Sequence, residues 1–389
     1  MVILDKPYVS ALLENTILES GLPVLRNKAA EKLNLTRKLY YITEKEFIHR
    51  VKTTGNYLIY CNSENPINWI AENLSFTDLP EKIDAFKNKV LFRDLLKQMH
   101  PDFFYKKVKL DELDDINIHN IKMPFIIKPS VGFFSIGVYK VDSIAEWENV
   151  KIQLNSELYT IGDKYPVQVI NTDTFIIEEN IKGKEFAVDL YYDKDSNPVI
   201  LNILEHIFPS GKDVNDRVYI TSKEIIQEYS DLFSDFLVEI GKLMTLQRFP
   251  MHIEFRVDAD KNIMPIEVNP MRFAGWCTTD IAYYAYGINV YKYFFEQKKP
   301  NWQEILDLKD KIYSIVIADV PKDIEPERIK KIDYAKFYSH FEKPLEMRRV
   351  NYLKYGVFAF LFAETRYENR QELDKILRSD LKEYLEFND

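Results

Sequence analysis

Short apolar runs alternate with helical patterns over the first hundred residues of the chain. Val2–Leu4 and the stretches LPVL, KLYYI and YLIYC are typical of buried strands, whereas residues 10–19 have helical spacing. Strands that alternate with helices predict a small α/β layer with a parallel sheet. No glycine fingerprint follows the first strand, so the pattern does not favour a dinucleotide site there.

The middle of the chain changes from helical to strand patterns. Residues 84–99, DAFKNKVLFRDLLKQM, predict one helix that ends before Pro101. The following segment is rich in predicted strands (PFIIKP, GVYKV, TFIIEENI and EFAVDLYYD), with one helical stretch over residues 143–155. A further strand, NPVILNILEHIF, precedes an amphipathic helix over residues 223–244.

The last third of the chain begins with a predicted hairpin. Residues 251–270, MHIEFRVDADKNIMPIEVNP, alternate on both sides of a turn and predict two paired strands. Residues 279–297 predict one aromatic helix, and QKKPNWQE predicts a linker to a last α/β unit with the strands YSIVIAD and GVFAFLFAET. We therefore predict four units, at residues 1–100, 101–192, 193–300 and 301–389.

Composition narrows the class of protein. The 389 residues, 46% apolar and 14% aromatic, indicate a globular chain of several subdomains. The net charge of −9 argues against a general nucleic-acid binder but leaves room for a small anionic ligand. Two cysteines, Cys61 and Cys277, support neither a disulfide framework nor a cysteine zinc site. Since no basic leader and no apolar run of membrane-spanning length is found, we expect a cytoplasmic protein without a membrane partner.

The predicted hairpin carries two carboxylates that face each other. With the turn centred on Asp260–Lys261, Glu254 lies opposite Glu267, with Cβ atoms about 4.5–5.5 Å apart. Carboxylates this close repel unless a proton or a cation lies between them. Asn269 shares the face of Glu267 and adds an amide oxygen, so the three side chains predict a site for Mg²⁺.

The alternative is an ordinary exposed hairpin whose acidic face is solvated. Two features favour the metal site: the polar pair of PIEVNP interrupts an otherwise apolar strand, and Arg256 and Arg272 flank the carboxylates.

Lys128 ends the predicted strand PFIIKP, where a plain core would favour Val or Ile. A buried ammonium group is costly unless a negative group meets it. Ser130, Gly132, Ser135 and Gly137 follow in a turn of small residues whose backbone N–H groups suit phosphate oxygens. The pattern predicts a nucleotide phosphate beside Lys128; the alternative is a simple turn, since the sequence has no Walker loop.

The stretch FIIEENIKGKEFAVD predicts two strands joined by a hinge. Backbone groups of residues 179–181 are placed to bond a base edge, and Glu185 is placed to accept from ribose hydroxyls. Taken alone, this stretch favours the alternative of a charged surface loop.

In order and spacing these elements resemble the ATP-grasp superfamily, the carboxylate–amine and carboxylate–thiol ligases, over about residues 88–289. The resemblance implies an ATP-grasp architecture of mixed α/β and α+β class. It comprises an N-terminal Rossmann-like (pre-ATP-grasp) domain, two α+β lobes that sandwich ATP, and a small C-terminal α/β unit. It also implies ATP as the nucleotide and Mg²⁺, or Mn²⁺, as the metal.

The resemblance implies roles for individual residues. Lys89 lies in NKVLFR, which resembles the family's Asp-Lys-x-x-x-Arg helix start with Asn88 in place of Asp. The loop after Lys128 has Phe133 and Phe134 where the family has more glycine, and Met271 displaces the arginine that follows Asn-Pro. The implied assignments are Lys89, Lys128 and Ser135 to the phosphates, Glu178, Glu179 and Ile181 to adenine, Glu185 to ribose, Glu254, Glu267 and Asn269 to the metal, and Arg272, Arg256 and Arg217 to the transferring phosphoryl group or the substrate carboxylate.

Residues 209–222 form a polar stretch in which Arg217 and Lys212 are candidate phosphate contacts; a surface loop is the alternative. The implied activity is an ATP-dependent ligase that forms an acylphosphate from a small carboxylate and joins it to an amine, releasing ADP and phosphate. A phosphotransferase on the same scaffold and a catalytically silent ATP-binding sensor are the alternatives. The aromatic helix and the last unit are candidate faces for a homodimer.

Overall fold

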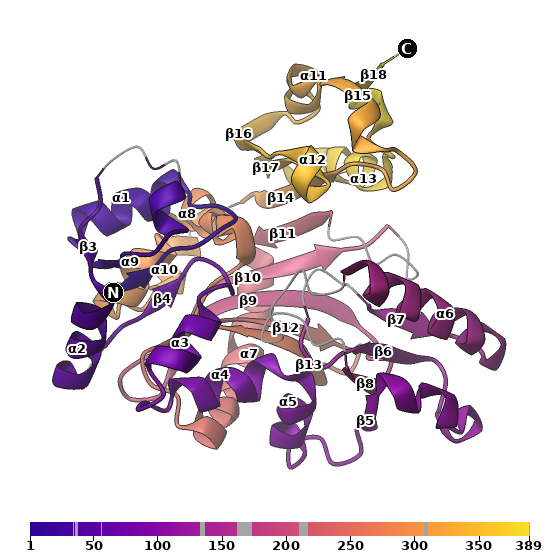
Figure 1. Ribbon diagram of the computed structural model, residues 1–389. Helices are drawn as coiled ribbons and strands as arrows, with labels where there is room; N and C mark the ends of the chain where they lie inside the picture. The colour runs from indigo at the N-terminus through magenta and orange to yellow at the C-terminus, as the bar shows by residue number, and fades with distance from the viewer. Residues whose placement is uncertain are drawn as a thin grey trace.

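The structure is a computed structural model that describes residues 1–33, 35, 38–55, 57–132, 137–161, 173–209, 217–306 and 310–388, with the backbone alone for 158–161. Within these ranges the structure contains three sheets of four, eight and four strands, together with a two-stranded ribbon near the C-terminus. Figure 1 shows the eight-stranded sheet running from the centre up into the C-terminal part of the molecule, with one four-stranded sheet to its left and the other to its right.

The N-terminal layer is a parallel sheet of order β3-β2-β1-β4, as the alternating pattern predicts. Ser10 and Thr43 begin two of its helices, because each side-chain oxygen accepts a hydrogen bond from the backbone N–H three residues on. Its elements are β1 Val2–Ile3, α1 Ala11–Glu19, β2 Val24–Leu25, η1 Ala30–Lys32, β3 Tyr41–Ile42, α2 Glu44–Thr54, β4 Tyr60–Cys61 and α3 Ile67–Asn73.

The single helix predicted over residues 84–99 is wrong. Two helices, α4 Leu79–Lys87 and α5 Lys89–Leu96, meet at Asn88, whose backbone is extended. The Asn88 side chain accepts a hydrogen bond from the backbone N–H of Val90, at 3.1 Å, and so caps the second helix. The break places Lys89 in the first turn of α5, where the unpaired N–H groups of a helix lie.

The small lobe is an antiparallel sheet of order β5-β8-β6-β7 covered by α6. Its core is separate from that of the rest of the molecule and centres on Phe125, Trp147 and Phe175. Its elements are β5 Tyr105–Lys109, η2 Leu110–Asp115, η3 Ile118–Asn120, β6 Phe125–Pro129, β7 Tyr139–Val141, α6 Ile144–Ile161 and β8 Thr174–Glu179. The loop residues Phe133, Phe134 and Ser135 lie outside the described residues.

The central sheet has the order β13-β12-β9-β10-β11-β14-β17-β16 and is antiparallel throughout. The long helix α7 packs on one face, where Phe233 stacks on Phe255 with ring centroids 4.8 Å apart. The elements of its first part are β9 Lys184–Tyr192, β10 Pro198–Ile207, β11 Val218–Ser222, α7 Lys223–Met244, β12 Phe249–Val257 and β13 Ile263–Pro270. The sheet runs across residues 192 and 300, and the division into units at these positions stays a prediction.

The aromatic helix predicted over residues 279–297 is instead broken at Gly287, whose φ of 71° ends the first segment in a left-handed cap. Beyond it, three strands complete the central sheet and carry the C-terminal helices. The elements are η5 Gly275–Asp280, α8 Ile281–Tyr286, α9 Val290–Glu296, α10 Trp302–Leu306, β14 Ile312–Asp319, η6 Pro326–Arg328, β15 Ile329–Ile332, α11 Tyr334–Ser339, β16 Lys343–Arg349, α12 Tyr352–Tyr355, β17 Val357–Thr365, η7 Tyr367–Asn369, α13 Gln371–Arg378, η8 Lys382–Tyr384 and β18 Leu385–Phe387. Within the described ranges, no helix combines the length and apolar character needed to span a membrane.

Candidate active site

Polar side chains line one face of the central sheet at the edge formed by β9, β12 and β13. Glu254 is directly opposite Glu267, so the predicted pairing of the two carboxylates is confirmed. The residues next to these carboxylates in the chain, Ile253, Phe255 and Val268, point to the opposite face of the sheet and are buried in the core. The hairpin therefore separates an apolar face from a charged one, as its pattern predicts.

The two opposed carboxylates differ in charge environment. Burial and the nearby Glu267 carboxylate raise the pKa of Glu254. Burial also acts to raise the pKa of Glu267, but neighbouring ammonium groups, Lys89 foremost, lower it to about 2. Lys89 Nζ lies 3.2 Å from Glu267 Oε2. The surroundings of Glu254 thus favour a charged carboxylate less than those of Glu267 do.

These carboxylates fit a divalent cation. The Asn269 Nδ2 atom donates to Glu267 Oε1 at 3.5 Å, which places an amide beside the pair. The side chains of Glu254 and Glu267 are 27% and 25% exposed, so a ligand has access to them. In the described part of the chain, no three His, Cys, Asp or Glu side chains gather to hold a metal. The third oxygen ligand would therefore come from Asn269, and carboxylate and amide oxygens suit Mg²⁺.

Lys128 does have a negative partner, and it lies within the protein. Its Nζ atom is 2.6 Å from Glu178 Oε1, while Arg93 Nε donates to Glu178 Oε2 at 2.8 Å. Burial lowers the pKa of Lys128. The two cations outweigh burial at Glu178 and lower its pKa to about 2. Arg93 also donates from Nη1 to the Pro265 carbonyl at 2.7 Å, which ties α5 to the hairpin.

The start of α5 lies against the end of the Lys128 strand. The Lys89 backbone N–H donates to the Ser130 carbonyl at 2.7 Å. Lys87, at the end of α4, donates from Nζ to the Gly132 carbonyl at 3.4 Å. Three lysines thus meet at the base of the loop that follows β6, and the like charge of Lys89 contributes to the lowered pKa of Lys128. The predicted contact Ser135 lies in the part of this loop outside the described residues.

Arg272 joins the site to the N-terminal layer. Its Nη2 atom lies 2.5 Å from Oε1 of Glu64, and Lys87 pairs with the other oxygen of the same carboxylate. Against burial, these two cations lower the pKa of Glu64 to about 2. Met271, just before Arg272, has a φ of 66°, which turns the chain sharply at the end of β13.

The segment after Arg272 has an unusual backbone. Trp276 and Cys277 have φ values of 56° and 55°, a left-handed conformation that side chains rarely adopt and that clusters at functional sites. Arg348 holds this segment: its Nη1 atom donates to the Cys277 carbonyl at 2.8 Å, and its Nη2 atom pairs with Asp280 at 2.7 Å.

A second buried pair lies on the same polar face. His252 is directly opposite Asp189 on β9, and its Nδ1 atom lies 2.8 Å from Asp189 Oδ1. Its Nε2 atom lies 3.6 Å from Glu254 Oε1. Burial acts to lower the pKa of His252, but the two carboxylates outweigh it and raise this pKa to about 9.

The hinge residues form a third polar group. Arg256 donates to Glu185 Oε2 from Nη2 at 2.8 Å and to the Ile181 carbonyl from Nη1 at 3.3 Å. His206 Nδ1 lies 2.9 Å from the other Glu185 oxygen. Glu179 Oε1 accepts from the Phe104 backbone N–H at 2.8 Å. The ribose and adenine assignments of these residues stay predictions.

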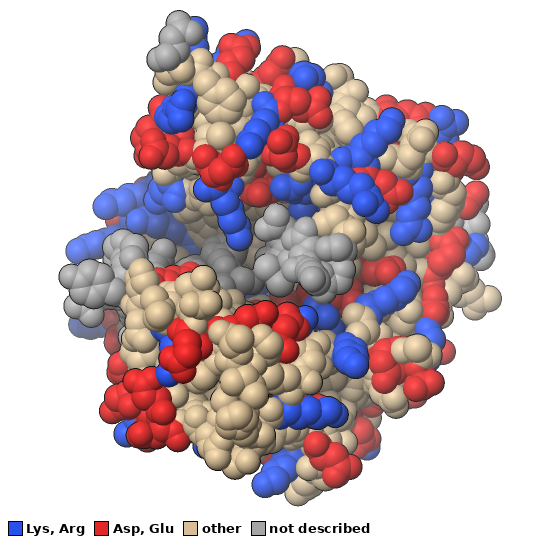
Figure 2. Space-filling view, turned by 90° about the vertical axis from the view of Figure 1, so that its right-hand side faces the viewer, with Lys and Arg blue, Asp and Glu red and all other residues tan. Residues whose placement is uncertain are grey.

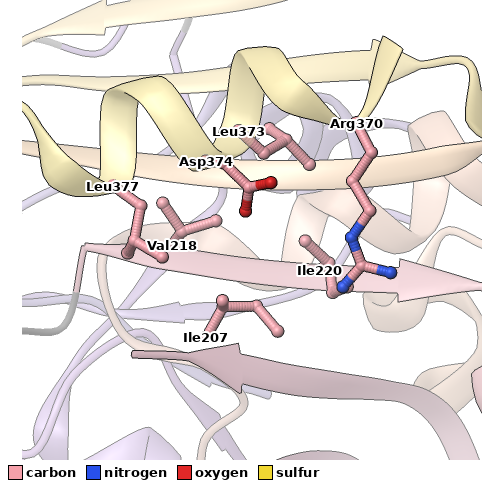
Figure 3. Close-up of a pocket in the computed structure, with 7 residues that line it drawn as sticks. All are labelled: Ile207, Val218, Ile220, Arg370, Leu373, Asp374 and Leu377. Carbon is pink, nitrogen blue, oxygen red and sulfur yellow. The ribbon is translucent and has the colours of Figure 1, made fainter. Parts of the chain in front are cut away.

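Arg217 lies in a different environment from the other predicted site residues. Its Nη2 and Nε atoms donate to Asp319 Oδ1, at 2.9 and 3.1 Å, and its Nη1 atom contacts the carbonyls of Leu377 and Ser379. Figure 3 shows the neighbouring cavity between the central sheet and α13. Aliphatic side chains, Arg370 and Asp374 line it: Ile207, Val218, Ile220, Arg370, Leu373, Asp374 and Leu377. Arg217 thus joins β11 to the C-terminal helix; Lys212, the other predicted residue here, lies outside the described residues.

Seen from the side of the small lobe, the molecule is hollowed between its upper part, which carries the C-terminal segment, and its lower part (Figure 2). Basic and acidic side chains lie on both sides of this hollow, whereas a broad uncharged area covers part of the lower surface. The surface around the hollow is therefore charged with both signs.

Sequence reasoning missed several members of this site. Arg93 lies four residues after Lys89, a spacing that places both side chains on one side of a helix, and NKVLFR therefore held the signal. On β9, Asp189 lies an even number of residues after Glu185, and on β12 His252 lies two residues before Glu254. Strand alternation therefore places both residues on the polar face and could have identified them. Glu64 follows a short strand in the N-terminal layer, and no local pattern links it to Arg272.

The comparisons with known proteins agree with this geometry. Residues 121–280 match the family model described as an ATP-grasp domain. The carbamoyl phosphate synthase large chain of Bifidobacterium longum is 26% identical over 196 residues, and that of Bifidobacterium adolescentis is 24% identical over the same length. Each match covers 49% of this chain, but this chain spans only 16% of the length of these relatives.

Solved structures share the fold over nearly the whole chain. An L-amino acid ligase from Bacillus licheniformis aligns with a TM-score of 0.66 and 16% identity, covering 100% of this chain and 98% of that one. An N5-carboxyaminoimidazole ribonucleotide synthetase from Thermotoga maritima aligns at 0.64 and 15%, with coverages of 99% and 98%. A biotin carboxylase from Campylobacter jejuni aligns at 0.65 and 13%, with coverages of 100% and 92%.

Proposed function

Since residues 121–280 match the ATP-grasp domain model, we propose that the chain is an ATP-dependent ligase of the ATP-grasp superfamily that joins a small carboxylate to an amine. One observation carries the proposal: Lys89 lies at the end of the Lys128 strand and also contacts Glu267 of the opposed carboxylate pair. The lysines that suit phosphate groups therefore lie next to the carboxylates that suit a divalent metal.

The nucleotide would lie between the small lobe and the central sheet. Lys128 and Lys89 would contact its phosphates, and the loop after Gly132, which includes Ser135, would supply backbone N–H groups. Adenine would lie at the hinge, near the backbone of Glu179 and Ile181, with Glu185 toward the ribose. The contact of Lys128 with Glu178 holds the ammonium group in place, because a lysine without a partner would avoid this buried position.

Glu254, Glu267 and Asn269 would hold Mg²⁺ or Mn²⁺. Such an ion, when bound, withdraws charge from the phosphate oxygens that it contacts. It would also relieve the repulsion that raises the pKa of Glu254. Lys89 remains near Glu267 as the cation that orients this carboxylate.

Arg272 would bind the substrate carboxylate near the γ-phosphate. An oxygen of that carboxylate attacks the γ-phosphorus, the bond from this phosphorus to the bridging oxygen breaks, and ADP leaves. The amine nitrogen then attacks the acyl carbon, loses a proton, and expels phosphate. The protein's part is to position the reactants and to stabilise negative charge.

The two other arginines predicted at the reacting centre have different partners. Arg256 holds Glu185 and the Ile181 carbonyl, and we assign it to the nucleotide end of the site. Arg217 contacts Asp319 and the C-terminal segment, and we assign it a role in holding β11 against that segment.

The test is an ADP-release assay with Mg²⁺ and ATP over amino acids and small dicarboxylates, alone and in pairs. A ligase releases ADP only when a carboxylate and an amine are both present, and hydroxylamine in place of the amine yields a hydroxamate. A stable phosphorylated product without an amine requirement would identify a phosphotransferase instead. ATP binding without ADP release over the whole panel would identify a sensor.

A further inference from the structure

The Asp189–His252 pair lies beside the proposed metal ligands but is not one of them. On the polar face, His252 is directly opposite Asp189 of β9 on one side and Asn269 of β13 on the other. Glu254 is the next residue on the same face of β12. The pair therefore borders two of the three proposed metal ligands, Glu254 and Asn269.

The contacts fix the His252 ring in one orientation. Its Nδ1 atom lies 2.8 Å from Asp189 Oδ1, and its Nε2 atom lies 3.6 Å from Glu254 Oε1. Asp189 and His252 are buried, at 1% and 6% exposure. A buried ring held at one nitrogen presents its other nitrogen in a constant direction, in this case toward a carboxylate that Glu267 repels.

Asp189 reaches a second part of the site. The oxygen that contacts His252 also accepts a hydrogen bond from the Ala274 backbone N–H, at 2.8 Å. Ala274 lies two residues after Arg272, at the start of the segment with left-handed Trp276 and Cys277. In the described structure the other Asp189 oxygen has no hydrogen-bond partner. A buried carboxylate oxygen without a hydrogen-bond partner destabilises the fold, so core packing alone does not account for Asp189 at this position.

We propose that Asp189 and His252 are positioning residues: the pair orients Glu254 toward the metal and fixes the segment that carries Arg272 relative to it. The inference rests on the proposed function, because it needs a metal at Glu254. Residues that surround metal ligands and hold them in position commonly change metal affinity about 10–100-fold when they are replaced.

Two substitutions of His252 separate orientation from packing. An asparagine amide superimposes on the Nδ1 side of the ring, so His252→Asn keeps the contact with Asp189 and loses the one with Glu254. A glutamine amide reaches the Nε2 side, so His252→Gln keeps the contact with Glu254. Asp189→Asn keeps the shape of the pair and removes its negative charge. His340→Gln is the control, because half-buried His340 contacts the Glu372 carbonyl and Tyr384, in the C-terminal segment.

The experiment measures Mn²⁺ binding by electron paramagnetic resonance in the presence of ADP, with circular dichroism as a check of folding. We expect His252→Asn and Asp189→Asn to weaken Mn²⁺ binding about 10–100-fold. His252→Gln should bind more tightly than His252→Asn, and His340→Gln should match the unsubstituted protein. ADP binding without metal should change little in any variant.

Two failures are distinguishable. If the unsubstituted protein does not bind Mn²⁺ with ADP, the metal site and with it the proposed function fail. If it does bind and His252→Asn binds equally well, or if the Asn and Gln variants lose affinity equally, then His252 does not orient Glu254 and the inference alone is overturned.

Discussion

Lys128 Nζ lies 2.6 Å from Glu178 Oε1, and the side chains of both residues are almost fully buried, at 6% and 2% exposure. Arg93 binds the other oxygen of Glu178. One carboxylate thus serves two cations, so the group carries a net positive charge inside the protein. A buried positive charge at the start of the loop after β6 suits a phosphate.

Replacing Lys128 by Met should lower the rate of ADP formation about 100-fold or more, the size of effect seen when one charge-stabilising donor is removed from an active site. The fold should survive because Arg93 still neutralises Glu178. Steady-state ADP release measures the change. Lys106→Met, at an exposed position of the same lobe, is the control and should keep full activity.

Glu178 should make the protein's stability depend on pH in the acid range. Its pKa is lowered from 4.5 to about 2, so its charged form stabilises the fold above pH 4.5 and this contribution is lost as the pH falls toward 2. The shift corresponds to a contribution on the order of 3 kcal/mol.

The measurement is the urea midpoint of the protein and of Glu178→Gln between pH 7 and pH 3. The difference between the two midpoints should be constant from pH 7 to about pH 5 and should shrink below that. A difference that is the same at pH 7 and pH 3 would contradict the lowered pKa of Glu178.

Glu267→Gln should abolish ADP release at ordinary Mg²⁺ concentrations while the protein stays folded, because the substitution removes a charged metal ligand. It also leaves Lys89 without its carboxylate partner, which adds to the loss. The assay is ADP release over a Mg²⁺ titration. Glu228→Gln, an exposed carboxylate that pairs with Lys261 at the hairpin turn, should match the unsubstituted protein. Unchanged turnover in Glu267→Gln would remove the metal assignment.

Local pattern predicted the hairpin well. Strand alternation sets which side chains share a face, and the pairing of Glu254 with Glu267 is as predicted. The register next to the turn is not, because Val257 lies opposite Ile263 and a one-residue shift between Phe255 and Glu254 then brings Glu254 opposite Glu267. The same reasoning failed at Asn88 and at Gly287, because apolar spacing continues through both breaks. In each case one residue, a side-chain cap or a left-handed glycine, ended a helix that the periodicity would have continued.

Long-range partners were beyond such reasoning. Glu64 and Arg272 are 208 positions apart, and only the packing of the N-terminal layer against the end of β13 brings them together. The same is true of Arg217, whose partner Asp319 and neighbour Ser379 belong to the C-terminal segment. The polar stretch around Arg217 predicted a phosphate contact, with a surface loop as the alternative, and neither reading contained its buried position against the C-terminal segment.

Arg272→Lys should raise the KM for the carboxylate substrate about tenfold, a change of ~1.4 kcal/mol, with a much smaller effect on the KM for ATP. A guanidinium can bind a carboxylate through two parallel hydrogen bonds, whereas an ammonium group binds it as a point charge. Arg272 Nη2 lies 2.5 Å from Glu64 Oε1. Because lysine is also positively charged, the substitution keeps a cation beside Glu64. Initial rates with each substrate varied in turn give both KM values, and Arg366→Lys, an exposed arginine paired with Glu342, is the control. A KM for ATP that rises as much as the KM for the carboxylate would place Arg272 at the nucleotide instead of at the acceptor.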